Sequence, residues 1–320
     1  MKQRIMHVLM LVGILILVLI IYKIGLKEIW FNISQISVLN FLILVFLRIL
    51  YWLLRTICWK TVLDSYEKHT ILNLFKARMA GHSVSQLTPT AMVGSEATRI
   101  YMAGCSNRKV SFASVIVDKT IEFLVVVFFT IIGVAMVLYR ISLPVKLKTI
   151  FIIGVLVATF LVLFFVAKQK NGLFGWIINI LAKLRIKPKF LNKFKKQIIE
   201  TDVHISSFYK KNRSDFFKTF LLYALLIMLW ATEIHLGLTY IGINNVTFID
   251  SFLITILGNL AFVFPLIPGS LGIYEATYIG LFAIFGMSAG AALTLVLIRR
   301  LIALLLAGFG LLGFIRSPDK

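Results

Sequence analysis

The sequence predicts an all-α, polytopic membrane protein, and three observations support this fold class. The 320-residue chain is 60% hydrophobic and only 15% charged, whereas soluble domains are roughly half apolar and about one quarter charged. The apolar residues form long uncharged runs, as membrane-spanning helices do. Lys and Arg number 34 against 13 Asp and Glu, a net charge of +21, and the positive-inside rule places such an excess in cytoplasmic loops.

The same composition excludes several classes of protein. No stretch of ordinary composition is long enough for a soluble catalytic domain, which needs about 100 residues. The basic excess is explained by membrane topology, so nucleic-acid binding is not expected. Cys58 and Cys105 lie in unrelated contexts, and neither a disulfide framework, nor a metal site, nor any cofactor is predicted. The sequence shows no ATP-binding G-x-x-x-x-G-K-[ST] motif.

Six apolar runs are long enough to cross a hydrocarbon core of about 30 Å. The first run follows Lys2 and Arg4 and has no small-residue cleavage site after it. It is therefore predicted to be a retained span with a cytoplasmic N-terminus rather than a signal peptide. In chain order the runs are 8–22, 41–59, 120–139, 147–167, 216–241 and 289–315.

Two further stretches, 86–99 (QLTPTAMVGSEATR) and 264–278 (FPLIPGSLGIYEATY), do not resemble simple spans. Both contain Pro, six intervening residues and then Glu-Ala-Thr, beginning at Pro89 and Pro268. A break at membrane depth frees backbone N–H and C=O groups, which lipid cannot satisfy. We therefore expect two re-entrant helical hairpins, at about 74–104 and 252–286, that are buried in protein or line a cavity.

Loop charges orient these elements. A cytoplasmic N-terminus brings Lys60, Lys68, Lys76 and Arg78 to the cytoplasm after the second span. The segment 168–218, with thirteen Lys and Arg against three acidic residues, and the C-terminus then also lie in the cytoplasm of a cell-membrane protein. The result is one transmembrane domain, 1–320, with an inverted repeat of 41–139 and 216–315. Inverted repeats with broken helices are typical of transporters.

The basic segment also has an apolar pattern. Phe190, Phe194, Ile198 and Ile205 recur at roughly helical spacing among the lysines. This pattern indicates either an amphipathic helix on anionic headgroups or a solvated linker with helical tendency, and the sequence leaves both open.

Ionisable residues within apolar runs are candidates for a binding site, because each costs about 2.5–3.5 kcal/mol at membrane depth. Structural pairing explains any one of them: Glu96 with Arg99, or Glu275 with one of the two arginines that follow it. Together, excess Arg and Lys beside broken helix ends favour an anion, and an anionic lipid is the expected partner. Glu233 and His235 also lie in an apolar run. The candidate site residues are Pro89, Gly94, Glu96, Arg99, Pro268, Gly269, Gly272, Glu275, Arg299, Arg300, Arg48, Arg55, Asp118, Lys119 and Glu122.

The stretch PLIPGSLGIYEATYIGLFAIFG resembles the P-x-P-G-G-x-G-x-x-E-A signature of the lysylphosphatidylglycerol synthase transmembrane region family, also called flippase-like or UPF0104 proteins. LTPTAMVGSEATRIYMAG and VDKTIE are similar to the first half of that family. The resemblance implies a lipid flippase and assigns functional roles to Gly94, Glu96, Pro268, Gly269, Gly272 and Glu275. Ser270 and Tyr274 depart from the family pattern of Gly and Arg.

Three functions follow from the sequence. The preferred one is a non-enzymatic transporter of an anionic phospholipid, an aminoacyl-phosphatidylglycerol or a polyprenyl-phosphate-linked lipid. The second is an intramembrane headgroup enzyme with Glu96 or Glu275 as general base. Five scattered histidines and the lack of a soluble aminoacyl-transfer domain disfavour it. The third is a non-catalytic partner of a glycosyltransferase or lipid-modifying enzyme, with 168–218 as the docking surface.

Overall fold

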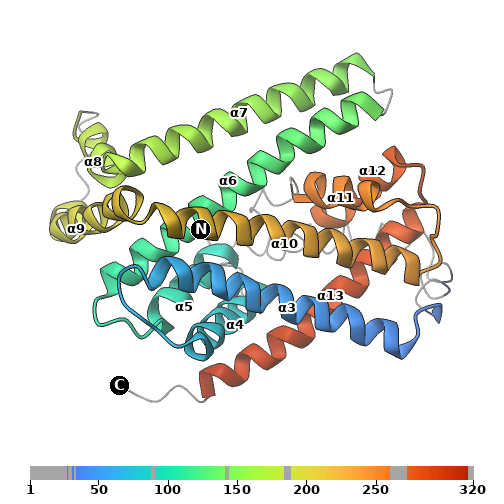
Figure 1. Cartoon of the computed structure of the whole chain (residues 1–320), viewed down its shortest axis with the longest axis horizontal. Coiled ribbons are helices and arrows are strands. Elements are labelled where there is room, and N and C mark those ends of the chain that lie inside the picture. The colour runs from blue at the N-terminus through green and yellow to red at the C-terminus, as the bar shows by residue number, and fades with distance from the viewer. Residues whose placement is uncertain are drawn as a thin grey trace. The chain divides into compact units, whose positions relative to one another are not determined.

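The computed structural model describes residues 27, 31, 34–87, 91–140, 144–183, 189–259 and 272–315. These residues form helices α3 to α13 and contain no strand (Figure 1). The prediction of an all-α, polytopic membrane protein is confirmed. The predicted first span, 8–22, lies outside the described residues.

Within the described part of the chain, five helices have the length and apolar composition needed to cross a membrane. A helix of 26 residues is about 39 Å long at 1.5 Å per residue, which exceeds the hydrocarbon thickness of about 30 Å. These five helices coincide with five of the predicted spans. They are α3 (Val38–Leu63), α6 (Arg108–Arg140), α7 (Val145–Lys170), α10 (Arg213–Tyr240) and α13 (Ala289–Ile315).

Short helices occupy the two stretches in which hairpins are expected. The first holds α4 (Ile71–Leu87) and α5 (Ala91–Met102), and the second holds α11 (Phe248–Gly258) and α12 (Ile273–Ile284). Helices of 11 and 12 residues are about 16–18 Å long, too short to cross the hydrocarbon core. The expected bends, near Pro89 and at Pro265–Gly269, lie outside the described residues.

By its internal contacts the chain divides into two compact units. Unit 1 comprises Met1–Leu54, Phe75–Arg99 and Leu225–Lys320, and unit 2 comprises Arg55–Leu74 and Ile100–Ala224. Helices α3, α4, α5 and α10 contribute residues to both.

The core of unit 1 lies where α10, α12 and α13 meet. Ile234, Tyr278, Phe282 and Val296 are fully buried there, and α12 packs on both α11 and α13. Helix α4 joins this core through polar contacts. The Ser83 hydroxyl donates to a carbonyl of α13 at 2.6 Å. Such a bond satisfies a polar side chain that would otherwise be costly to bury.

Close packing of α4 on α13 predicts that Gly310→Ala destabilises unit 1. A Cβ at Gly310 would lie 2.3 Å from the carbonyl oxygen of Met79 and 2.3 Å from the Ser83 hydroxyl. The expected cost is about 1–3 kcal/mol. Gly308→Ala is the matched control on the same helix, because a Cβ there meets nothing within 4 Å, and it should stabilise by up to about 1 kcal/mol. Thermal unfolding in detergent measures both, and equal midpoints would contradict this packing.

Unit 2 is built on the two long helices α6 and α7, which pack side by side (Figure 1). Helix α9 (Lys189–Lys211) packs on α6, α7 and α8 (Leu173–Lys183). The Asp202 carboxylate of α9 accepts hydrogen bonds from the backbone N–H groups of Phe174 and Gly175, at 3.0 and 2.7 Å, and so anchors the start of α8.

This arrangement bears on both interpretations of the basic segment. Residues 189–211 form α9, which packs on three other helices of unit 2, so they are not a solvated linker. Ile205 is fully buried among the helices of unit 2, so this residue does not face headgroups as the amphipathic pattern suggested. Ile205 is buried because α9 packs against α6, α7 and α8. The spacing of apolar residues in the sequence does not reveal these neighbouring helices.

Candidate functional site

A buried ionic group in unit 1 joins three helices. It consists of Arg48 on α3, Glu233 on α10 and Arg299 on α13. The Arg48 Nη2 donates to Glu233 Oε1, and Arg299 Nε lies 3.4 Å from the same oxygen. Glu233 is 2% exposed and Arg299 is 7% exposed. One carboxylate thus compensates two guanidinium groups, which leaves this group one positive charge in excess.

Aromatic side chains surround the two arginines. Arg299 Nη1 donates to the hydroxyl of Tyr278 at 2.8 Å. The Trp230 ring centroid lies 5.1 Å from the guanidinium carbon of Arg299 and 6.0 Å from that of Arg48. Cation–π contacts of this kind offset part of the desolvation of a buried cation. The aromatic rings therefore hold the guanidinium groups in place without cancelling their charge.

A second ionic pair in unit 1 lies at the start of α12. Glu275 is fully buried, and its Oε1 accepts from Arg300 Nε at 2.5 Å. Its Oε2 accepts from the backbone N–H of Gly272 at 2.7 Å. Gly272 precedes the helix with a φ of 78°, a conformation that glycine adopts without strain. The Glu275 carboxylate thus caps α12 and compensates Arg300 at once.

The charges of these two groups do not balance. Arg48, Arg299 and Arg300 face two acidic partners, Glu233 and Glu275. Arginine is the side chain best suited to bidentate recognition of phosphate or carboxylate. Among the described residues, these three arginines therefore outnumber the two carboxylates that they contact.

Two further buried arginines belong to unit 1. Arg99 Nη1 donates to Glu96 Oε2 at 2.5 Å, three residues before it on α5, and Arg99 is 1% exposed. Gly94, also on α5, is half-buried. Arg78 is 3% exposed on α4, so it is buried within the protein although polar residues surround it in the sequence.

The remaining candidates form a balanced group in unit 2. Arg55 Nη2 donates to Glu122, and Lys119 Nζ lies 3.0 Å from the same carboxylate. The Tyr223 hydroxyl donates to Asp118 at 2.7 Å. Two basic and two acidic residues balance within this group, unlike the arginine-rich groups of unit 1.

The structure therefore brings together some of the predicted site residues and separates others. Arg299 and Arg48 share one partner, Glu275 pairs with Arg300, and Arg55 belongs to unit 2 although it lies one heptad after Arg48 on α3. Pro89, Pro268 and Gly269 lie outside the described residues.

Trp230 and Tyr278, which complete the group in unit 1, are not selected by the sequence pattern. Glu233 is among the ionisable residues within apolar runs, but it is not in the set of candidate site residues. An acid inside an apolar run marks Glu233 as unusual, but nothing in the spacing assigns its partners. The nearby His235 contacts Ser251, with 3.1 Å between its Nδ1 and the hydroxyl oxygen, and lies outside this group of charges.

Comparisons with known proteins find similarity to membrane proteins. The sequence model of the family described as "Lysylphosphatidylglycerol synthase TM region" matches residues 7–310. A protein of Methanothermobacter thermautotrophicus described as a UPF0104 membrane protein is 26% identical over 318 residues, which cover 92% of this chain and 90% of the relative. No solved structure matches the chain. Because the match extends over nearly all of the sequence, the chain belongs to the lysylphosphatidylglycerol synthase transmembrane region family.

Proposed function

We propose that this protein is a transporter, not an enzyme, and that it moves an anionic lipid between the two leaflets of the cell membrane. The observation that supports this most is the group of three arginines and two glutamates in the apolar core of unit 1. The expected substrates are phospholipids, aminoacyl-phosphatidylglycerol or polyprenyl-phosphate-linked lipids. All of them join a phosphate to an apolar body.

A phosphate would bind by exchange of partners. Glu233 holds two arginines with one oxygen, so an entering phosphate can take Arg299 while Arg48 keeps the carboxylate. Phosphate oxygens accept two parallel hydrogen bonds from one guanidinium. The incoming negative charge also compensates the excess positive charge. Phosphate binding therefore leaves no carboxylate without a basic partner. When the phosphate leaves, Arg299 returns to Glu233.

In this proposal the two short-helix segments, α4–α5 and α11–α12, are re-entrant and oppositely oriented. Each carries the Glu of the repeated motif, Glu96 or Glu275. Alternate exposure of the arginines to the two leaflets would then move the headgroup, as in transporters built from inverted repeats. A lipid-modifying enzyme or glycosyltransferase that makes or uses the lipid is the proposed partner.

The proposed topology predicts on which side two exposed positions lie. Asn107 precedes α6 and Asn245 lies between α10 and α11. With both termini cytoplasmic, Asn107 faces the cytoplasm and Asn245 the exterior. In a Cys58→Ser, Cys105→Ser background, an impermeant maleimide should label Asn245→Cys in intact cells. It should label Asn107→Cys only after permeabilisation. Labelling of both in intact cells, or of neither before permeabilisation, would overturn this topology.

Reconstitution tests the transport function itself. The full chain is placed in vesicles that contain a trace of fluorescent phosphatidylglycerol or phosphatidylcholine, and an impermeant reductant bleaches the outer leaflet. The remaining fluorescence then decays at the rate of lipid exchange. We expect faster exchange of phosphatidylglycerol than in protein-free vesicles, with a smaller effect on the zwitterionic lipid. No acceleration for any anionic lipid would contradict the proposal, and chemical turnover of the headgroup would favour an enzyme.

A further inference from the structure

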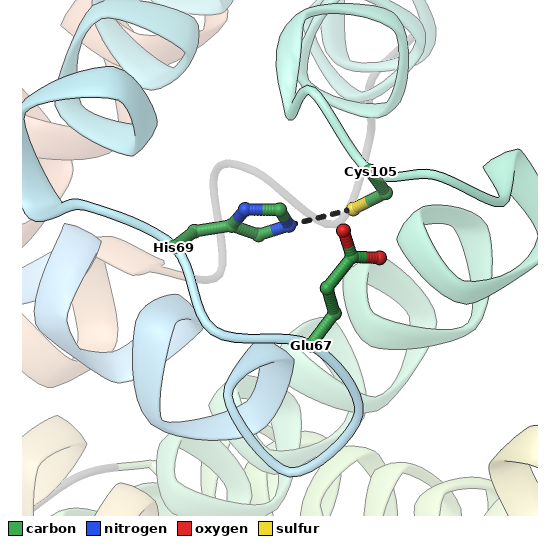
Figure 2. A group of neighbouring side chains, drawn as sticks. All are labelled: Glu67, His69 and Cys105. Carbon is green, nitrogen blue, oxygen red and sulfur yellow. Dashed lines mark hydrogen bonds between the residues drawn. The ribbon is translucent and has the colours of Figure 1, made fainter.

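Three side chains with metal-binding atoms meet in unit 2, apart from the buried arginines. Glu67 and His69 lie in the connection between α3 and α4, and Cys105 lies in the connection between α5 and α6. Figure 2 shows the imidazole, the carboxylate and the thiol pointing toward one another. One ligand atom from each residue lies within 4.8 Å of the other two. The His69 Nε2 and the Cys105 sulfur are 3.2 Å apart.

The chemistry of this donor set narrows the class of ion. Imidazole nitrogen and cysteine sulfur are ligands of Zn²⁺ and similar transition metals, whereas Mg²⁺ and Ca²⁺ prefer oxygen. In a tetrahedral zinc site, bonds of about 2.0–2.3 Å place the ligand atoms roughly 3.3–3.6 Å from one another. The nitrogen–sulfur separation is already close to that value. Side-chain rotation of Glu67 would bring its oxygen to the same range, and water would supply the fourth ligand.

Neighbouring groups fix the Glu67 side chain and the backbone of His69. The backbone N–H of Ser106 donates to the Glu67 carboxylate at 3.2 Å and its hydroxyl at 2.9 Å. The backbone N–H of His69 donates to Asp64 Oδ1 at 3.2 Å. Hydrogen bonds to the ligands are a usual feature of metal sites, where they fix ligand orientation. All three side chains are half-buried, which leaves the site open to an ion from solvent.

A reactive thiol explains this cluster less well. Burial raises the pKa of the Cys105 thiol to about 11, and the negative charge of Glu67 adds to the shift. Reactive cysteines have the opposite environment, with a lowered pKa and nearby cations. The other cysteine of the chain, Cys58, is buried on α3.

We propose that Glu67, His69 and Cys105 form a binding site for Zn²⁺ or a similar transition-metal ion. His69 lies two residues before the start of α4, and Cys105 lies three residues after the end of α5. A bound ion would therefore join the two chain segments that lead into and out of the α4–α5 segment. This site does not depend on the proposed transport function, because its three ligands belong to unit 2 whereas the arginines of the proposed lipid site belong to unit 1.

Thiol protection tests the site on the full chain, purified without a polyhistidine tag. The chain has two cysteines, so Cys58→Ser leaves Cys105 as the single thiol. After chelator treatment, a saturating concentration of Zn²⁺ should slow maleimide labelling by roughly tenfold or more. Excess Mg²⁺ should have no effect, and chelator should restore the original rate. Co²⁺ should give the absorption of a cobalt–thiolate bond, and this readout needs no variant of the ligands.

Ligand variants in the Cys58→Ser background identify the other partners. His69→Ala and Glu67→Gln should each reduce the protection by Zn²⁺, whereas His204→Ala should retain it. His204 is the matched control in unit 2, because its ring contacts Tyr66 and none of the three ligands. Equal labelling rates with Zn²⁺ and Mg²⁺, or full protection in His69→Ala, would overturn the proposal. The cluster would then be a set of hydrogen bonds that closes the two connections.

Discussion

Lipid exchange by the Glu275→Gln variant is expected to be at least tenfold slower than that of the wild-type protein. The glutamine amide oxygen can still accept the hydrogen bond from the Gly272 N–H, but it cannot compensate Arg300. Glu275 is fully buried, and this change removes the carboxylate charge that faces the partly buried Arg300 guanidinium. The start of α12 would therefore rearrange, and the excess positive charge beside the proposed headgroup path would rise.

Two further variants separate the charge of Glu275 from its role as a helix cap. Glu275→Ala loses both functions and should exchange lipid no faster than Glu275→Gln. Thr277→Ala is the control on the same helix, because its hydroxyl bonds only a carbonyl of α12, and it should retain wild-type exchange. The assay is the vesicle bleaching experiment, with equal amounts of protein confirmed as folded by size-exclusion chromatography. Wild-type exchange in Glu275→Gln would show that Arg300 needs no carboxylate.

Glu233→Ala is expected to have the largest effect on stability. Glu233 is 2% exposed and is the shared acidic partner of Arg48 and Arg299. Its removal leaves two guanidinium groups in an apolar core without that partner. Breaking a buried ion pair by removing one member costs about 3–5 kcal/mol. Denaturant or thermal unfolding in detergent should show this loss of free energy of unfolding.

The control for this prediction is the same change at a solvent-accessible ion pair. Glu200 binds Lys109, and the two side chains are 37% and 30% exposed. Solvent screens such a pair, so Glu200→Ala should cost about 1 kcal/mol or less. If Glu233→Ala unfolds at the same midpoint as Glu200→Ala, the two buried arginines do not depend on that carboxylate.

The spans were predictable from sequence because a hydrocarbon core imposes one simple requirement, a long run without charge. Five such runs are the five long helices. Helix α4 fails that requirement because it carries Arg78, His82 and Ser83. These polar side chains are nevertheless buried, because α13 supplies their partners. One carbonyl oxygen of α13 lies 3.2 Å from His82 Nε2, and another accepts a hydrogen bond from the Ser83 hydroxyl. Partners supplied by a helix more than 200 residues away cannot be recognised from local composition.

The partners of the buried charges were predictable only in part. Short separations along one helix are visible in the sequence, and the Glu96–Arg99 pair forms as the spacing suggests. Glu275 had two equivalent candidates in the sequence, and the structure pairs it with the second, Arg300. The three-residue set Glu67, His69 and Cys105 was missed altogether, because its members come from separate connections that only folding brings together.

Arg299 gives the most direct test of the claim that unit 1 carries an anionic headgroup. The measurement is the rate of phosphatidylglycerol exchange in vesicles that contain Arg299→Gln, with Arg108→Gln as the control. Arg108 is exposed and its guanidinium lies over the ring of Tyr101. A charged hydrogen bond contributes about 1.5–3 kcal/mol, so we expect exchange by Arg299→Gln to fall by roughly ten- to hundredfold while Arg108→Gln stays near wild type. Equal rates for folded Arg299→Gln, Arg108→Gln and wild-type protein would contradict the claim.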